Sequence, residues 1–131
     1  MSVLEMIAVD LGASSGKVIH GKYDGRRIFV EPLNQFDNIP VRIHDTLYWD
    51  ILSIYREILG GFRAARGKRI ASIGVDSWGN SFGFIDRNEA LISNPVHYRD
   101  DRTIGMMEKV FEIVPRESVY RQTGIQFNNQ W

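Results

Sequence analysis

Residues 8–23, AVDLGASSGKVIHGKY, decide the fold of this chain. They contain GASSGK, the letters of a nucleotide-binding P-loop, but a P-loop has four residues between its glycines, then Lys and Ser or Thr, then a helix. Here three residues separate Gly12 from Gly16, and Val18 stands where the hydroxyl belongs. The apolar residues that follow alternate loosely, which predicts a strand. The stretch is therefore interpreted as two strands joined by a turn of small residues.

A strand that ends in Asp and enters a Gly/Ser turn has a defined chemistry. The turn presents backbone N–H groups and two hydroxyls on one side, and such a concave nest holds an anion. Asp10 would repel a phosphate directly but can hold Mg²⁺, directly or through water. Lys17 adds a positive charge. The alternative stays open that the turn needs no ligand and that Asp10 is simply a turn former.

The strands around this turn predict a three-stranded antiparallel meander. Asp24 and Gly25 form a strong hairpin signal between the second and third strands. Pro32 indicates an edge strand or a bulge. The three strands are expected at residues 6–11, 17–23 and 27–36.

After a loop expected at residues 38–46, the pattern changes to that of an amphipathic helix. Asp50 is the expected N-cap, and the helix should end near Gly67. Gly60 and Gly61 within it weaken a helix by roughly 1 kcal/mol each relative to Ala, so close packing should compensate. The apolar stripe consists of Ile51, Ile54, Tyr55, Ile58, Leu59 and Phe62.

The remaining chain predicts one more strand and then helices. The strand is expected at residues 70–77, and Arg87 and Asn88 mark a second hairpin between residues 82–86 and 90–93. Thr103 is the expected cap of a helix that carries Met106, Met107, Val110, Phe111 and Val114, and a shorter helix should cover residues 116–122 before Gly124. The order of strands and helices predicts an α/β or α+β layered fold.

Residues 74–84, GVDSWGNSFGF, repeat the logic of the first motif: a strand, Asp76, then small residues. Gly79 would let a ligand approach the backbone, and the Trp78 indole can pack on the apolar face of a sugar. The alternative is a core Trp beside a glycine in a bulge.

A third motif, HYRDDRT at residues 97–103, is dense in charge. Arg102 can donate a forked set of hydrogen bonds to a polyol or a phosphate. A metal cluster of His97, Asp100 and Asp101 and a solvated turn with ordinary surface ion pairs are the alternatives.

Composition narrows the class of protein. The 131 residues include 16 basic and 16 acidic side chains and no cysteine. A neutral chain gives no support for a nucleic-acid or membrane-surface partner. The first residues, MSVLEMIAVDLG, lack the basic start of a signal peptide, and no apolar run reaches the length of a membrane span. A cytoplasmic protein is expected.

Four motifs together resemble the N-terminal region of the FGGY carbohydrate kinases, in the actin/hexokinase/Hsp70-like ATPase superfamily. They are VDLGASSGK at residues 9–17, SIGVDSWG at 72–79, PVHYRDDRT at 95–103 and TGIQF at 123–127. The resemblance implies an α/β, ribonuclease H-like first domain, incomplete here, with a mixed sheet. It implies that residues 1–131 are the first part of that domain and that a second, ATP-binding domain follows Trp131.

The same resemblance implies a reaction and its residues. The reaction is ATP-dependent phosphorylation of a ketose or deoxy-sugar hydroxyl, with L-rhamnulose phosphorylated at O1 as the first expectation. Gly79, Trp78 and Arg102 would contact the sugar, and Asp10 would bind Mg²⁺. The general base would lie beyond Trp131, so these residues alone should be inactive. The expected ATP-phosphate contacts are Ala13, Ser14, Ser15, Gly16 and Lys17.

One departure keeps alternatives open. The kinases that phosphorylate L-rhamnulose usually continue Val-Asp-Phe after Trp-Gly, whereas this chain has Asn80-Ser81-Phe82. L-Fuculose and L-ribulose are therefore alternative substrates. A non-catalytic actin-like module that binds ATP or a sugar is the alternative from another class. The expected partners are the sugar, ATP and the remainder of the kinase, and surfaces meant for that remainder would favour self-association of these residues.

Overall fold

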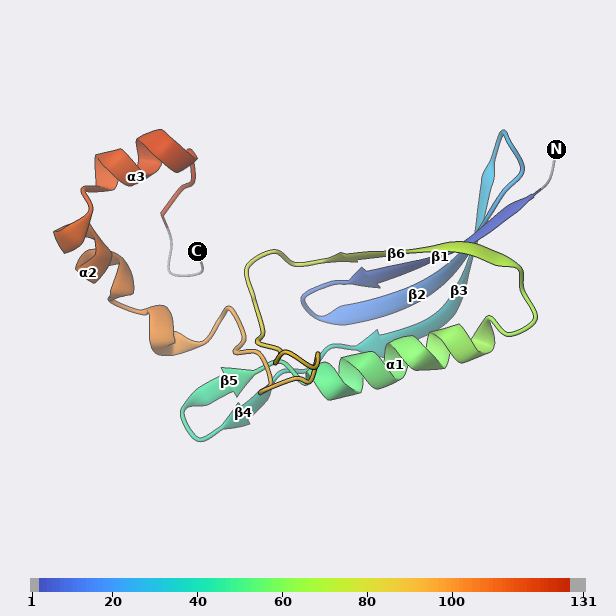
Figure 1. Cartoon of the computed structure of the whole chain (residues 1–131), viewed down its shortest axis with the longest axis horizontal. Helices are drawn as coiled ribbons and strands as arrows, with labels where there is room; N and C mark the ends of the chain where they lie inside the picture. The colour runs from blue at the N-terminus through green and yellow to red at the C-terminus, as the bar shows by residue number, and fades with distance from the viewer. Residues whose placement is uncertain (1–2, 128–131) are drawn as a thin grey trace.

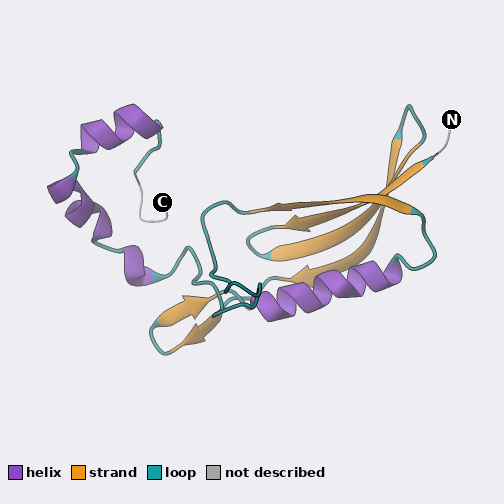
Figure 2. Ribbon diagram, viewed as in Figure 1, coloured by secondary structure: helices purple, strands orange, loops and turns teal. Residues whose placement is uncertain are grey.

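The computed structural model describes residues 3–127 and contains a curved sheet, a long helix against it and a helical C-terminal segment (Figure 1, Figure 2). The order of elements is β1 (Leu4–Leu11), β2 (Ser15–Tyr23), β3 (Ile28–Asp37), β4 (Val41–Ile43), β5 (Thr46–Tyr48), α1 (Ile51–Ala64), β6 (Ile70–Ser77), the 3-10 helix η1 (Asp101–Thr103), α2 (Met106–Ile113) and α3 (Arg116–Thr123).

The main sheet has the strand order β3-β2-β1-β6. β1, β2 and β3 pair antiparallel, and β6 pairs parallel to β1. The predicted mixed sheet with an antiparallel meander is therefore confirmed. Because β1 and β6 run in the same direction, their carboxyl ends and the β1–β2 turn lie at the same edge (Figure 1).

Local signals explain why the meander forms. The Asp24 carboxylate accepts hydrogen bonds from the backbone N–H groups of Arg26 and Arg27, both at 2.8 Å, and Gly25 has φ 96°. This closes the β2–β3 turn as predicted. β3 is the edge strand, and its register with β2 shifts opposite Val18 and Ile19, beside Pro32. A proline lacks the N–H that a central strand would need.

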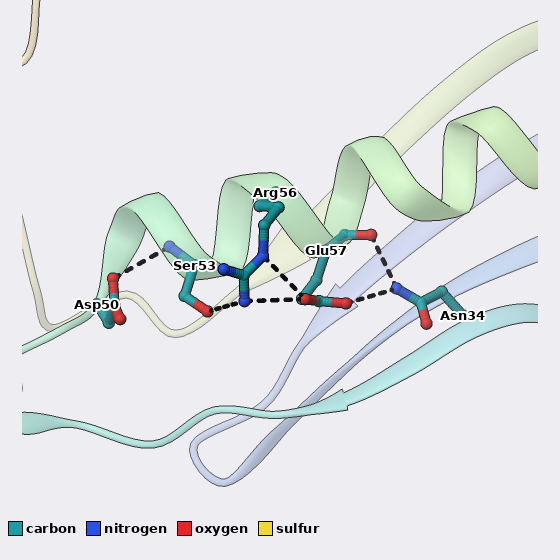
Figure 3. A network of polar contacts seen from close by, with 5 residues as sticks. All are labelled: Asn34, Asp50, Ser53, Arg56 and Glu57. Atoms are coloured by element: carbon teal, nitrogen blue, oxygen red, sulfur yellow. Dashed lines mark hydrogen bonds and ion pairs between the residues drawn. The ribbon is translucent and has the colours of Figure 1, made fainter.

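α1 is anchored at its start and along its length (Figure 3). The Asp50 carboxylate accepts from the backbone N–H of Ser53 at 3.0 Å, which confirms the predicted N-cap. Asn34 on β3 donates its amide to the backbone carbonyl of Glu57 at 2.8 Å and to the Glu57 carboxylate at 3.2 Å. Arg56 holds the same carboxylate from the other side. These contacts fix the helix over the meander.

Close approach between α1 and β2 requires a glycine. A Cβ on Gly61 would lie 2.5 Å from the Val18 side chain, so only a hydrogen fits there. Val18 is fully buried in a cluster with Ile7, Val9 and Ala65. The predicted compensation for the paired glycines is thus confirmed at Gly61.

α1 leaves β6 uncovered. Ile73 and Val75 lie level with Ile7 and Val9 on the sheet face that carries α1, yet they are 54% and 67% exposed. β6 also stands at the edge of the sheet order. The core therefore sits between α1 and the strands β1 to β3.

Two expectations before β6 were wrong. Residues 38–46 are not all loop: they contain β4 and enter β5, which pair antiparallel around His44, with φ 51°. Three-residue strands are too short to show a period, and the turn lacks the usual glycine. Tyr55 does not belong to the buried stripe of α1, because it is 61% exposed.

After β6, the expected hairpin is confirmed and the expected cap of α2 was wrong. The hairpin around Arg87 and Asn88 is present in a short form, with an antiparallel bridge between Ile85 and Leu91. The backbone N–H groups of Asp86 and Ile92 donate to the carbonyls of Ala90, at 2.9 Å, and Phe84, at 3.0 Å. Thr103 does not cap α2: it ends η1, and Gly105, with φ 75°, precedes α2. The predicted helix before Gly124 is confirmed as α3, and Gly124 has the left-handed φ of 67°.

Candidate active site

Two carboxylates and one lysine form a row across three strands. Asp10 on β1 is the register partner of Lys17 on β2 and of Asp76 on β6. Register partners project from the same face of a sheet, and neighbouring strands lie about 4.8 Å apart. The buried partners Val9 and Val18 face α1, so the row lies on the opposite face.

The charges of this row are not neutralised within the fold. Asp10 and Asp76 are exposed, and among residues 3–127 neither carboxylate takes part in a hydrogen bond or an ion pair. Two like charges on adjacent strands repel each other and favour a cation between them. The sequence showed Asp76 as a repeat of the Asp10 motif but gave it no role. The signal was present in the shared Val-Asp ending of two parallel strands.

The predicted anion-binding turn is built by a residue that the sequence did not reveal. Asn38 is 3% exposed; its backbone N–H donates to the Ser14 carbonyl and its side-chain amide to the Gly12 carbonyl, both at 2.9 Å. Gly12 in turn donates to the Ser15 carbonyl at 2.9 Å. Ala13 is exposed at the tip of the turn. The turn is therefore supported from beneath, with its tip in solvent.

The five predicted phosphate contacts have different positions. Ala13 and Ser14 are in the turn, exposed, and donate their N–H groups to no backbone group of residues 3–127. Ser15 and Gly16 are the first residues of β2, and Gly16 is buried. A Cβ at Gly16 would lie 2.3 Å from the Phe36 ring. The turn, Lys17 and Asp10 are thus brought together at one edge.

The second motif contributes the Trp78 ring to a stack of aromatic side chains. The Trp49 and Trp78 rings are stacked with centroids 4.0 Å apart, and His97 lies 3.9 Å from Trp49 on a tilted plane. Trp49 is 1% exposed, and its indole N–H donates to the Ser81 hydroxyl at 3.0 Å. Trp78 is therefore supported by a buried ring, which the sequence could not show.

A cavity of about 210 Å³ opens beside this stack. Its lining includes Leu11 and Ser77, which are register partners at the ends of β1 and β6. They come one residue after Asp10 and Asp76, so the cavity and the carboxylate row share the same sheet edge. The complete lining is Leu11, Trp49, Ile51, Ser77, Trp78, Ser81, Phe82, Gly83 and Pro95.

Of the three predicted sugar contacts, only Trp78 lines this cavity. Gly79 is exposed, and a Cβ there would meet nothing within 4 Å. Arg102 lies on η1 and is exposed. The structure therefore brings Trp78 to the edge and leaves Gly79 and Arg102 outside the cavity lining.

The carboxylate of Asp100, next to η1, binds the backbone of two other residues. The Asp100 carboxylate is 5% exposed and accepts from the backbone N–H groups of Leu47 at 2.6 Å and Arg102 at 3.1 Å. The Leu47 bond, followed by the Arg102 bond, lowers the pKa of Asp100. Burial and then the charge of Arg99 lower the pKa of His97, whose Nδ1 accepts from the Arg99 N–H. Asp100 thus joins the third motif to β5.

The donor set of the row suits a hard cation. Mg²⁺ is commonly held by one or two carboxylates together with waters and substrate phosphates. Asp10 and Asp76 meet that description. In the part of the chain that the structure describes, no group of three or more His, Cys, Asp or Glu side chains gathers at one point.

None of the helices in that part is both long and apolar enough to cross a membrane.

Solved structures define the class of fold. A gluconate kinase from Lactobacillus acidophilus superposes with a TM-score of 0.75 at 15% identity, covering 98% of this chain and 26% of that one. A Plasmodium falciparum glycerol kinase with ADP gives 0.73 at 15% identity, over 98% and 27%. The chain therefore has the ribonuclease H-like fold of these two kinases, as the motifs predicted.

Curated sequences sharpen the comparison. The chain is 42% identical over 123 residues to the rhamnulokinase of Oceanobacillus iheyensis, and 41% identical over 124 residues to that of Bacteroides thetaiotaomicron. These alignments cover 92% and 93% of the chain but only 26% of each relative. The resemblance to carbohydrate kinases that the motifs predicted is confirmed: these relatives are rhamnulokinases, and the alignments span about a quarter of their length. No protein-family model matches the chain.

Proposed function

We propose that this chain forms the phosphate- and sugar-binding edge of an ATP-dependent carbohydrate kinase. The observation that carries the proposal is the shared register of Asp10, Lys17 and Asp76, beside a turn whose tip is exposed. Two unpaired carboxylates, a cation and open amides are the groups that a nucleotide phosphate with Mg²⁺ requires. The similarity to rhamnulokinases supports the same activity.

Each group has a proposed task. The N–H groups of Ala13 and Ser14 would face phosphate oxygens, and Lys17 would offset their charge. Asp10 and Asp76 would hold Mg²⁺, which neutralises charge on the transferred phosphoryl group when bound. Trp78, with Gly79 and Arg102, would contact the sugar. Little covalent chemistry is asked of the protein, because phosphoryl transfer depends mostly on positioning and charge.

L-Rhamnulose is the proposed acceptor, and L-fuculose and L-ribulose are the alternatives. The proposal follows the identity to rhamnulokinases. The general base and the adenosine-binding residues are proposed to lie outside these residues, since the chain spans about a quarter of its relatives' length. Residues 1–131 alone should then release no ADP.

The test is an ADP-release assay on the full-length gene product, with Mg²⁺, ATP and a panel of ketoses. Turnover with L-rhamnulose and not with L-fuculose or L-ribulose is expected. Turnover with another ketose would replace the substrate and keep the class. If the protein binds ATP or a ketose in calorimetry but releases no ADP with any sugar, the chain is a binding module and the kinase proposal fails.

A further inference from the structure

The cavity beside the aromatic stack contains one hydroxyl that is fixed in place but incompletely paired. Ser81 lines the cavity, and its oxygen accepts the indole N–H of Trp49 at 3.0 Å. Trp49 is 1% exposed and packed between the rings of Trp78 and His97. A donor held between two rings has no freedom to follow its acceptor, so it fixes the position of the Ser81 oxygen.

The chemistry of a hydroxyl determines what Ser81 can still do. A serine has one O–H donor and two acceptor lone pairs, and Trp49 occupies one lone pair. Among residues 3–127 no acceptor receives the Ser81 proton. The other hydroxyl of the lining, Ser77, donates to the carbonyl of Trp78 at 3.4 Å. Ser81 therefore has a free donor at the cavity wall.

The rest of the lining indicates the class of ligand. None of the nine lining residues carries a charge, and most present apolar surface. Placing a carboxylate or a phosphate against such a wall would leave the ion without a partner. A neutral sugar with one face of C–H groups can instead lie against the rings and offer one oxygen to the donor.

We propose that Ser81 orients a neutral sugar in this cavity by donating its hydroxyl proton to one sugar oxygen, and that Trp49 is the positioning residue that holds Ser81 for this task. The inference rests on the proposed function, because it takes the acceptor sugar as the ligand.

The experiment compares variants of the full-length gene product in the ADP-release assay and in calorimetry with the ketose that the wild-type protein uses. Ser81→Ala should raise the KM for the ketose by roughly tenfold, the loss expected for one hydrogen bond, with the KM for ATP unchanged. Ser81→Thr keeps a hydroxyl and should retain most of the affinity. Ser93→Ala, at an exposed serine outside the cavity lining, is the matched control.

Trp49→Phe tests the positioning role. It removes the indole donor while keeping an aromatic ring, so it should also raise the ketose KM, and combining it with Ser81→Ala should add little further loss. An unchanged ketose KM in Ser81→Ala, or an equal rise of both KM values, overturns the inference while the proposed function stands. Failure of the wild-type protein to bind any sugar overturns both proposals.

Discussion

Asp10 and Asp76 stand level with each other on two parallel strands, 66 positions apart in the sequence and adjacent in the sheet. Each is flanked by a valine that faces the other side of the sheet. Because side chains alternate between the two faces along each strand, both carboxylates lie on the same face of the sheet. The pair exists because α1 carries the chain from β3 back to the far side of β1.

Removing one carboxylate of this pair should weaken binding of Mg²⁺. In Asp76→Asn, we expect the Mg²⁺ concentration for half-maximal ADP release by the full-length gene product to rise roughly tenfold, the scale of one charged contact. The control is Asp45→Asn, at an exposed position in the β4–β5 turn. Without Mg²⁺, Asp76→Asn should raise the melting temperature, because it relieves repulsion. A lower melting temperature without Mg²⁺ would argue against the paired charges.

Substitutions at the two adjacent glycines of α1 should have opposite effects. Gly61→Ala places a Cβ about 2.5 Å from Val18, and overpacking of this kind lowers the free energy of unfolding by about 1–3 kcal/mol. Gly60→Ala meets only the Asn34 amide, at 3.5 Å, and should gain up to about 1 kcal/mol from helix propensity. Urea denaturation of the two variants measures the difference. Equal changes in the free energy of unfolding at both positions would show that α1 and β2 are not tightly packed at Gly61.

The support beneath the turn should matter for the nucleotide more than for the fold. Asn38→Ala deletes the 2.9 Å bond to the Gly12 carbonyl. We expect a higher KM for ATP with an unchanged KM for the sugar, because the turn tip loses its fixed position. Gln122→Ala, at an exposed position on α3, serves as the control. A change in the sugar KM alone would contradict the assignment of the turn to phosphate.

Acid should loosen the junction between β5 and η1. The backbone N–H groups of Leu47 and Arg102 hold the pKa of Asp100 below its ordinary value of 3.8. The folded state thus binds this proton more weakly than the unfolded chain. The stabilisation is complete above the unfolded pKa and is lost as the pH falls through the folded one. Asp100→Asn should flatten the stability profile below about pH 4, measured by urea denaturation, whereas Asp101→Asn at the neighbouring exposed position should leave the profile steep.

Features written locally in the sequence could be predicted from it. The turn at Asp24 and Gly25, the N-cap at Asp50 and the glycine after α3 each depend on neighbouring residues. Residues 70–77 combine β-branched side chains with a clear end, and β6 has those bounds. Such signals act over a few residues, so a single sequence carries them.

Features that depend on distant pairing could not be predicted. The proposed role of Asp76 follows from its register with Asp10, which only the crossover through α1 establishes. The bond between Trp49 and Ser81 joins residues 32 positions apart, and Asn38 reaches back 26 positions to Gly12. No period or spacing in the sequence encodes these contacts, because they arise from packing.

β6 combines two properties that act together. It brings Asp76 to the carboxylate row, and it is also the outer strand of the sheet, with Ile73 and Val75 exposed beside α1. An outer strand with apolar side chains favours pairing with a further strand. Whatever polypeptide adds to β6 becomes the immediate neighbour of the second carboxylate. Addition of a strand to β6 would therefore also complete the surroundings of the proposed Mg²⁺ site.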